Sequence, residues 1–197
     1  MSVTELLLGI MVLASVAGLT FAPVLLERSL FRPYWLVPKR QYATLVTSGF
    51  MHANLAHLAF NAFTFWSFGR ALEGAIGPQR FLVLYVLGLL VSNGGTWLKH
   101  RADPAYASLG ASGAILAVLF ASVVYFPTQS LYILPVPVPI PAPWFAVGYL
   151  AYSWYASRFL HGRVNHDAHF GGAIAGLAFV ALTDPDAWRR AISLVLH

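Results

Sequence analysis

The chain has 197 residues, of which 58% are hydrophobic and only 10% are charged. Soluble domains carry about 25% charged residues, so this composition excludes an ordinary soluble protein and indicates a membrane protein. The absence of cysteine excludes disulfides, thiol chemistry and cysteine-ligated metals. The formal net charge is +5, and the basic residues lie in short loops between apolar segments. We therefore expect the positive charge to meet anionic lipid headgroups rather than nucleic acid.

Charge-free intervals predict the membrane spans, because a bilayer core of about 30 Å needs about 20 apolar residues per helix. The N-terminal stretch MSVTELLLGIMVLASVAGL has no basic residue, so we interpret it as a retained first span rather than a cleaved signal peptide. The six predicted spans are 6–26, 50–68, 81–98, 109–126, 144–160 and 169–182. The sequence thus predicts an all-α, polytopic transmembrane helical bundle, with residues 1–197 forming a single membrane domain.

Between the fourth and fifth predicted spans lies a proline-rich segment, FPTQSLYILPVPVPIPAPW. Proline cannot continue a helix, so we expect this segment to be an extended connector. After the sixth span, AWRRAISLVLH is expected to form a short surface helix.

Three polar residues fall at one depth in the predicted bundle. Ser112, His169 and His57 lie on the fourth, sixth and second spans, which cross in the same direction. Each lies roughly 20–22 Å along its helix from the same membrane face, at a rise of 1.5 Å per residue. The pattern therefore brings a hydroxyl and two imidazoles together, about 10 Å below the opposite face.

A serine becomes a nucleophile when an adjacent base removes its proton, and histidine is the usual base. No Asp or Glu lies within the spans at this depth, so the pattern favours a Ser112–His169 dyad over a triad. Ser112 also begins its helix, where free backbone N–H groups can bind a developing anion.

Small residues beside the dyad predict close packing of the fourth and sixth spans. Gly172 and Gly176 lie on the same helix face as the histidine, at i+3 and i+7 from it. Gly113, Ala117 and Ala121 form a matching ridge below the serine. Such ridges let helix backbones approach closely in lipid.

The second span carries a polar face made of Asn54, His57, Asn61 and Thr64. Imidazole and carboxamide N–H groups at the level of the serine would suit an oxyanion hole. Because helical side chains point toward the helix N-terminus, Asn61 is expected to reach back toward that level from one turn deeper.

Three motifs, HANLAHLAFN (52–61), GASG (110–113) and AHFGGAIAG (168–176), together resemble the rhomboid intramembrane serine proteases. The similarity covers about residues 42–182. The resemblance implies a six-span fold and cleavage of transmembrane-anchored substrates without a cofactor or metal.

Each site residue carries over from the family at its matching position. By the resemblance, Ser112 is the nucleophile, His169 the general base, and His57 and Asn61 the oxyanion donors with the Ser112 amide. Gly172 and Gly176 match the family's helix-packing glycines, and Glu73 matches its acidic residue after the second span. The chain departs from the family at Leu116, where well-known members have an aromatic residue that stacks on the histidine. Leu36 also replaces the arginine of the family's Trp-Arg pair.

We therefore interpret the chain as an intramembrane serine endopeptidase acting on transmembrane protein substrates among membrane lipids. One alternative is a catalytically silent rhomboid-like scaffold that binds transmembrane segments. A second is a metal-binding transporter using the histidines His52, His57, His166 and His169, which lacks carboxylates within its spans. Fluorophosphonate labelling distinguishes the three.

The location and orientation follow less directly from the residues. We expect an integral multi-pass protein of a prokaryotic cell membrane, with its active site opening outside the cytoplasm as in the family. The positive-inside rule favours the opposite orientation, because eight basic residues flank the opening and four lie on the other face. His166 and Asp167 are expected to be solvated loop residues, and His52 to cap or steady the second span. The sequence leaves the oligomeric state and the physiological substrate open.

Overall fold

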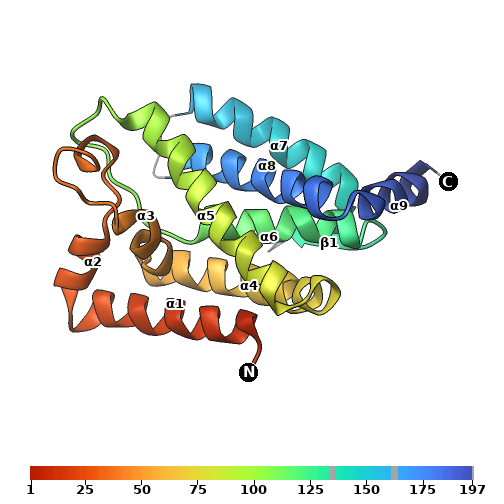
Figure 1. The fold of residues 1–197 in the computed structure, drawn as a ribbon, viewed down its shortest axis with the longest axis horizontal. Coiled ribbons are helices and arrows are strands. Elements are labelled where there is room, and N and C mark those ends of the chain that lie inside the picture. The colour runs from red at the N-terminus through yellow and green to blue at the C-terminus, as the bar shows by residue number, and fades with distance from the viewer. Residues whose placement is uncertain (134–135, 161–163, 197) are drawn as a thin grey trace.

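The computed structural model of the protein describes residues 1–133, 136–160 and 164–196 (Figure 1). The described chain is mainly helical, which confirms the predicted all-α class. In chain order its elements are α1 (Val3–Thr20), α2 (Pro23–Ser29), η1 (Pro33–Trp35), α3 (Thr44–Thr47), η2 (Ser48–Phe50), α4 (Leu55–Ile76), α5 (Pro78–His100), α6 (Ser112–Tyr125), β1 (Ser130–Ile133), β2 (Val136–Pro141), α7 (Ala142–Phe159), α8 (His166–Thr183) and α9 (Pro185–Leu196).

Each of the six predicted spans overlaps one long helix, namely α1, α4, α5, α6, α7 or α8. By length and composition, α1 and α5 are long and apolar enough to cross a membrane, and α6 is apolar but shorter. The tail forms α9, the surface helix that the sequence predicted, and it lies at the edge of the bundle beside the C-terminal end of α8 (Figure 1).

The first predicted span is shorter in the structure than in the sequence analysis. The prediction extended to residue 26, but α1 ends at Thr20 and α2 starts at Pro23. Proline has no N–H to donate, and it disfavours helical geometry in the residue before it. Ala22 accordingly has φ −135° and ψ 59°, and the chain turns there.

The second predicted span is displaced toward the C-terminus. The Asn54 side chain accepts a hydrogen bond from the amide of His57 (2.8 Å), so α4 begins at Leu55 rather than near residue 50. The helix continues past the charge of Arg70 and ends at Ile76, where Gly77, with φ +83°, is the C-cap. Charge-free intervals therefore underestimated the length of α4.

The proline-rich segment is extended, as expected, but its described part also forms an antiparallel hairpin. Ser130, Leu131 and Tyr132 of β1 lie opposite Pro141, Ile140 and Pro139 of β2. The N–H groups of alternate residues in a strand point to the same edge, so alternating prolines leave one edge of β2 able to donate. Leu134 and Pro135 lie outside the described residues.

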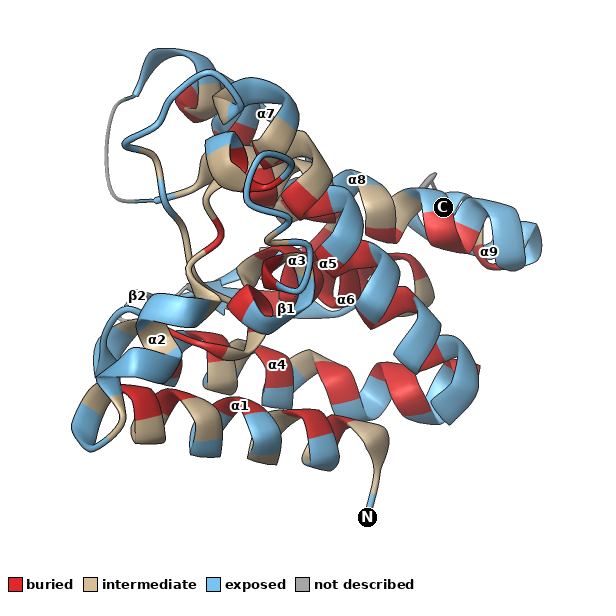
Figure 2. Cartoon of the chain, turned by 60° about the vertical axis from the view of Figure 1, so that its left-hand side comes forward, coloured by how far each residue is buried: buried red, intermediate tan, exposed pale blue. Residues whose placement is uncertain are grey.

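Helix α6 is the centre of the bundle. Every residue from Gly113 to Val124 is buried, and α6 contacts α4, α5 and α8. Figure 2 shows the buried residues on α6 and on the inner faces of its neighbours, with exposed residues on the outer faces of α1, α4 and α7. The serine at the start of α6 is therefore carried on the most enclosed helix.

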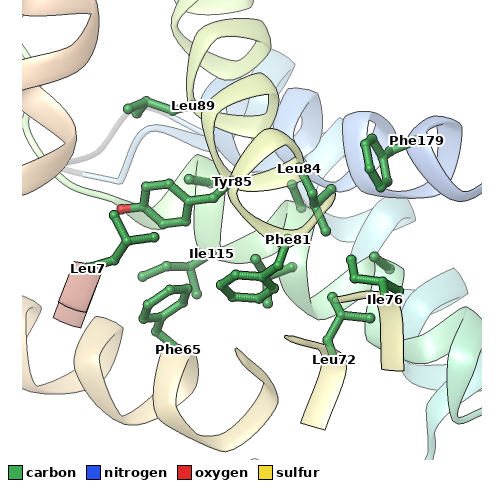
Figure 3. Close-up of a cluster of buried hydrophobic side chains, with 14 of the residues drawn as sticks. Leu7, Phe65, Leu72, Ile76, Phe81, Leu84, Tyr85, Leu89, Ile115 and Phe179 are labelled. Atoms are coloured by element: carbon green, nitrogen blue, oxygen red, sulfur yellow. The ribbon is translucent and has the colours of Figure 1, made fainter. Parts of the chain in front are cut away.

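Below the serine, aromatic rings join α4 and α5 to α6 (Figure 3). The ring of Phe65 lies 5.3 Å from that of Tyr85 and 6.0 Å from that of Phe81, centroid to centroid. All three are fully buried and pack against Ile115 of α6 and Leu7 of α1. This cluster fixes the relative positions of the helices that hold the site.

The outer faces of the helices are apolar. Large hydrophobic side chains are exposed on α1, α4, α5 and α7, including Leu13, Phe60, Val91, Trp144 and Val147. Soluble monomers rarely expose apolar patches that extend over several elements. The outer surface is therefore suited to lipid.

Candidate active site

Ser112 is the first residue of α6, and the chain turns sharply just before it. Gly110 has φ +130°, a backbone conformation that favours glycine, and its amide donates to the carbonyl of Ser48 (3.0 Å). The serine hydroxyl therefore lies at a helix N-terminus, where the first backbone N–H groups have no intrahelical partner.

His169 approaches that hydroxyl from the first turn of α8. Its Nε2 lies 2.9 Å from Ser112 Oγ. The Asn165 side chain accepts a hydrogen bond from the Ala168 amide (3.0 Å) and so caps α8 just before the histidine. At this distance the imidazole can accept the proton of the serine.

The close approach of α8 to α6 depends on glycine. A Cβ placed on Gly172 would overlap the backbone of Gly113, and one placed on Gly176 would overlap the backbone of Ala117. A Cβ on Gly113 would overlap the side chain of Ser92 on α5. The three predicted packing glycines thus lie where three helices meet, directly below the serine and the histidine.

The second ring nitrogen of His169 also has a partner. The hydroxyl of Tyr149, on α7, lies 3.0 Å from His169 Nδ1. The Tyr149 ring is nearly parallel to the imidazole, at 27° with centroids 6.5 Å apart. Leu116, at the position expected for a stacking aromatic, packs in the apolar cluster between α6 and α7. The sequence analysis did not select Tyr149, because nothing in its spacing separates it from the other aromatics of α7.

His57 and Asn61 converge on the turn before the serine. A Cβ on Gly110 would lie 3.0 Å from His57 Nε2 and 3.8 Å from Asn61 Nδ2. The Asn61 carboxamide reaches toward the N-terminus of α4, in the direction that the sequence analysis expected. Thr64, on the same predicted polar face, instead donates to the carbonyl of Phe60 in its own helix (2.9 Å). Only part of that face is therefore directed at the site.

His52 is fully buried and links α1 to α4. Its Nε2 lies 2.8 Å from Asn61 Nδ2, and its Nδ1 lies 2.9 Å from Ser15 Oγ. Since the Asn61 amide can only donate, the proton of His52 belongs on Nδ1 and is donated to Ser15. Ser15 in turn donates to the carbonyl of Phe50 (3.0 Å). Sequence reasoning missed the role of Ser15, which has no distinguishing pattern in an apolar helix.

Asp167 is not the solvated loop residue that the sequence suggested. It lies in the first turn of α8, and its carboxylate contacts Lys99 Nζ (2.9 Å) and His100 Nε2 (3.2 Å) at the end of α5. The His100 ring stacks on Tyr106, and burial, together with the Asp167 charge, raises the pKa of Tyr106 to about 12. These contacts connect the helix carrying the histidine to α5. His166 also lies within α8 rather than in a loop.

A narrow polar cleft adjoins Ser112. It is lined by backbone and small polar side chains, namely Ser48, Ser92, Asn93, Ser108, Leu109, Gly110, Ser112, Gly113, Asn165 and Ala168. The Asn93 amide donates to the carbonyl of Leu45 (2.8 Å) and lies 3.3 Å from Ser48 Oγ. The cleft therefore offers several hydrogen-bonding groups beside the hydroxyl of Ser112.

The four histidines of the metal-transporter alternative form two pairs of neighbouring rings. The rings of His52 and His57 lie 4.9 Å apart, and those of His166 and His169 lie 5.9 Å apart. Among the described ranges 1–133, 136–160 and 164–196, no group of three or more His, Cys, Asp or Glu residues could hold a metal ion.

Comparison with known families gives one domain match. The model of the Rhomboid domain matches residues 39–185, which confirms the resemblance seen in the sequence. The match contains the serine, both site histidines, the carboxamide and the packing glycines.

Curated relatives share about 30% identity with the chain. The mitochondrial presenilin-associated rhomboid-like protein of Mus musculus is 29% identical over 174 residues, which cover 86% of this chain and 46% of the relative. Rhomboid protein 1, mitochondrial, of Saccharomyces cerevisiae is 31% identical over 162 residues, or 76% of this chain and 45% of the relative. RHOMBOID-like protein 12, mitochondrial, of Arabidopsis thaliana is 30% identical over 160 residues, which cover 71% of this chain and 46% of the relative. The chain thus spans about half the length of the curated relatives it matches.

These relatives correct the expected location. The sequence analysis expected a prokaryotic cell membrane, whereas the mouse, yeast and plant relatives are all mitochondrial proteins of eukaryotes. The expectation was wrong because apolar composition indicates a membrane without distinguishing one membrane from another.

Proposed function

The chain belongs to the rhomboid family, and we propose that it is an intramembrane serine endopeptidase that cleaves transmembrane-anchored proteins with Ser112 and His169. The observation that carries the proposal is the distance of 2.9 Å between His169 Nε2 and Ser112 Oγ, formed by residues 57 positions apart in the chain. At this distance the imidazole can act as a general base toward the hydroxyl.

The proposed reaction begins with attack of Ser112 Oγ on a peptide carbonyl carbon. His169 Nε2 takes the hydroxyl proton as the new C–O bond forms, and the carbonyl π electrons move onto its oxygen. The resulting imidazolium then gives the proton to the amide nitrogen as the oxyanion re-forms the carbonyl and the C–N bond breaks, which leaves an acyl-enzyme on Ser112. These steps use only side chains of the chain itself.

The developing oxyanion is held by N–H donors that converge above the turn at Gly110. The backbone N–H of Ser112 belongs to the first turn of α6, and the side chains of His57 and Asn61 approach Gly110 from α4. Donors arranged before the reaction act on the charge that appears in the transition state.

Hydrolysis of the acyl-enzyme needs water beside Ser112. The polar cleft lined by Ser48, Asn93 and Ser108 adjoins the serine, and we infer that water reaches Ser112 through it. His169 then removes a proton from that water as the water oxygen attacks the acyl carbon, and returns the proton to Ser112 Oγ as the ester bond breaks and the acid is released.

We infer that α1, α4, α5, α6, α7 and α8 are six membrane spans, and that residues 1–197 act as one membrane domain. The exposed apolar side chains of α1, α4, α5 and α7 support contact with lipid, and we infer transmembrane protein segments as the substrates. The names of the relatives support a mitochondrial membrane as the location.

Fluorophosphonate labelling and cleavage of a reconstituted transmembrane substrate test the proposal. Wild type should be labelled and should cleave, whereas Ser112→Ala should lose both activities. His169→Ala should lower kcat about 10⁴-fold or more, and the double variant should be no worse than Ser112→Ala, because the two residues act as a unit. All three variants should keep the wild-type thermal midpoint in detergent.

Two results would contradict the protease. Clear turnover by purified Ser112→Ala would remove Ser112 from the reaction. A folded wild type that is neither labelled nor active, but binds transmembrane peptides, would favour the scaffold function instead.

A further inference from the structure

Tyr149 contacts the proposed general base, His169, and has no role in the reaction steps above. Its hydroxyl lies 3.0 Å from His169 Nδ1, on the side of the imidazole away from Ser112. Within the described residues, Tyr149 is the only side chain that hydrogen-bonds this nitrogen. The contact joins α7 to α8, so it does not arise from local helix geometry.

Packing holds the Tyr149 ring in place. Phe145, one turn earlier on α7, stacks on it at 26° with centroids 5.5 Å apart, and Phe120 of α6 lies 5.9 Å from it. Ala142 and Ala146 are buried on the same side of α7 and bring its backbone close to α6 and α8. The hydroxyl is therefore directed at the imidazole by three helices rather than by one rotamer alone.

The position of the protons follows from the chemistry. To accept the proton of Ser112, Nε2 must carry a lone pair, so neutral His169 has its proton on Nδ1. That N–H points at the Tyr149 oxygen, which has lone pairs to accept it. When Nε2 gains the serine proton, the ring becomes an imidazolium, and the same hydrogen bond then has a charged donor and becomes stronger.

We propose that Tyr149 is a positioning residue for the dyad, which rests on the proposed function. Its oxygen selects the Nδ1-protonated form of His169, fixes the rotation of the ring and stabilises the imidazolium. A buried carboxylate has this task in the Ser-His-Asp arrangement. Here a neutral hydroxyl from α7 takes that place, so this partner brings no charge to the histidine.

Tyr149→Phe tests the proposal, because it removes the hydroxyl and keeps the ring. The matched control is Tyr155→Phe on the same helix, because Tyr155 is 51% exposed and its ring packs on Phe159. Both variants are reconstituted with a transmembrane substrate, and rates are divided by the number of sites counted by exhaustive fluorophosphonate labelling. This normalisation removes any unfolded protein from the comparison.

We expect Tyr149→Phe to lower kcat about 10- to 100-fold, the size of a lost hydrogen bond to a charged group. The fluorophosphonate inactivation rate should fall in parallel, while KM and the thermal midpoint stay at the wild-type values. Tyr155→Phe should match wild type throughout. A purely structural tyrosine would instead lower the midpoint and leave kcat per labelled site unchanged.

The outcomes separate this inference from the proposed function. If wild type neither labels nor cleaves, the protease proposal fails. If wild type is active and Tyr149→Phe has wild-type kcat per labelled site, only the role of Tyr149 is overturned. A rise in KM with unchanged kcat would also overturn it, since it would place the hydroxyl against the substrate rather than the histidine.

Discussion

The two sides of the site are held together in different ways. Between α6 and α8, Gly172 and Gly176 rest directly on the backbone of the facing helix, with no space for a side chain. Between α1 and α4, Ser15, His52 and Asn61 form a chain of hydrogen bonds across a buried polar interior. The first side, which we call the glycine seam, carries the proposed dyad, and the second, the polar network, carries the proposed oxyanion donors.

The difference shows which property each part of the site requires. The dyad needs two helices at one separation, and backbone contact sets that separation because a backbone cannot rotate away. The donors need two side chains aimed at one point, and directional hydrogen bonds set that aim. We therefore expect changes in the glycine seam to be close to all-or-none, and changes in the polar network to be graded.

The largest effect is expected in the glycine seam. In Gly172→Ala the new methyl overlaps the backbone of Gly113, and in Gly176→Ala it overlaps the backbone of Ala117. To relieve the overlap, α6 and α8 must move apart, and this movement separates His169 from Ser112. We expect cleavage to be abolished and stability to fall by about 3 kcal/mol, the upper end of overpacking penalties. Thermal unfolding in detergent and substrate cleavage measure the two effects.

Gly148→Ala on α7 is the matched control, because nothing lies within 4 Å of a Cβ at that position. Alanine is favoured over glycine in a helix by about 1 kcal/mol, so this variant should be neutral or slightly more stable. Wild-type stability in Gly172→Ala and Gly176→Ala would contradict close contact at the seam.

The residues of the glycine seam are also the ones that sequence patterns selected most directly. Equal depth on three helices predicted that Ser112, His169 and His57 would lie together, and i, i+3 and i+4 spacing predicted which small residues face one another. Helical period and rise are fixed by backbone geometry, so the depth and the face of each residue can be calculated from its position in the sequence. The family match over residues 39–185 contains all three motifs.

A smaller effect is expected where the polar network reaches the site. Removing one oxyanion donor costs about 10² to 10³ in rate. Because the backbone N–H of Ser112 and one side chain remain in each variant, Asn61→Ala should lie near the lower value and His57→Ala above it. Both should lower kcat more than they raise KM, since the donors act mainly on the transition state. Steady-state kinetics with a reconstituted substrate provide the measurement.

Thr64→Val is the control for this pair, because Thr64 lies on the same predicted polar face but bonds to its own helix. It should keep wild-type kinetics. Unchanged kcat in both His57→Ala and Asn61→Ala would contradict the oxyanion role and would mean that the polar face of α4 is only structural.

The polar network shows where prediction from sequence stops. Ser15 lies in an apolar helix far from the motifs, and Tyr149 is one of several aromatics on α7. Their contacts depend on how α1 and α7 are rotated about their axes, and tertiary packing sets that rotation rather than local pattern. The break at Pro23 is local, because proline acts on the chain next to it, but the charge-free interval to residue 26 passed over it. Contacts between helices that are far apart in the chain depend instead on tertiary packing, which no local pattern shows.

The smallest effect is expected for the hydrogen bond between His52 and Asn61, and it tests whether the polar network acts as a unit. His52→Ala removes the acceptor for the Asn61 amide and the donor to Ser15, both in a buried site. Leaving such groups without partners costs about 1–3 kcal/mol in stability. The rate should fall about tenfold or less, because the Asn61 amide stays near Gly110 but loses its fixed direction.

A double-mutant cycle of His52→Ala and Asn61→Ala measures the coupling. If the two side chains act through their hydrogen bond, the double variant should be less destabilised than the sum of the single variants, by about 1 kcal/mol. The same cycle between His52→Ala and Gly176→Ala should be additive, because among the described residues His52 bonds to Ser15 and Asn61, whereas Gly176 faces the backbone of Ala117. Additive behaviour of His52 and Asn61 would mean that each side chain is held by packing alone, and the two sides of the site would then be stabilised in the same way.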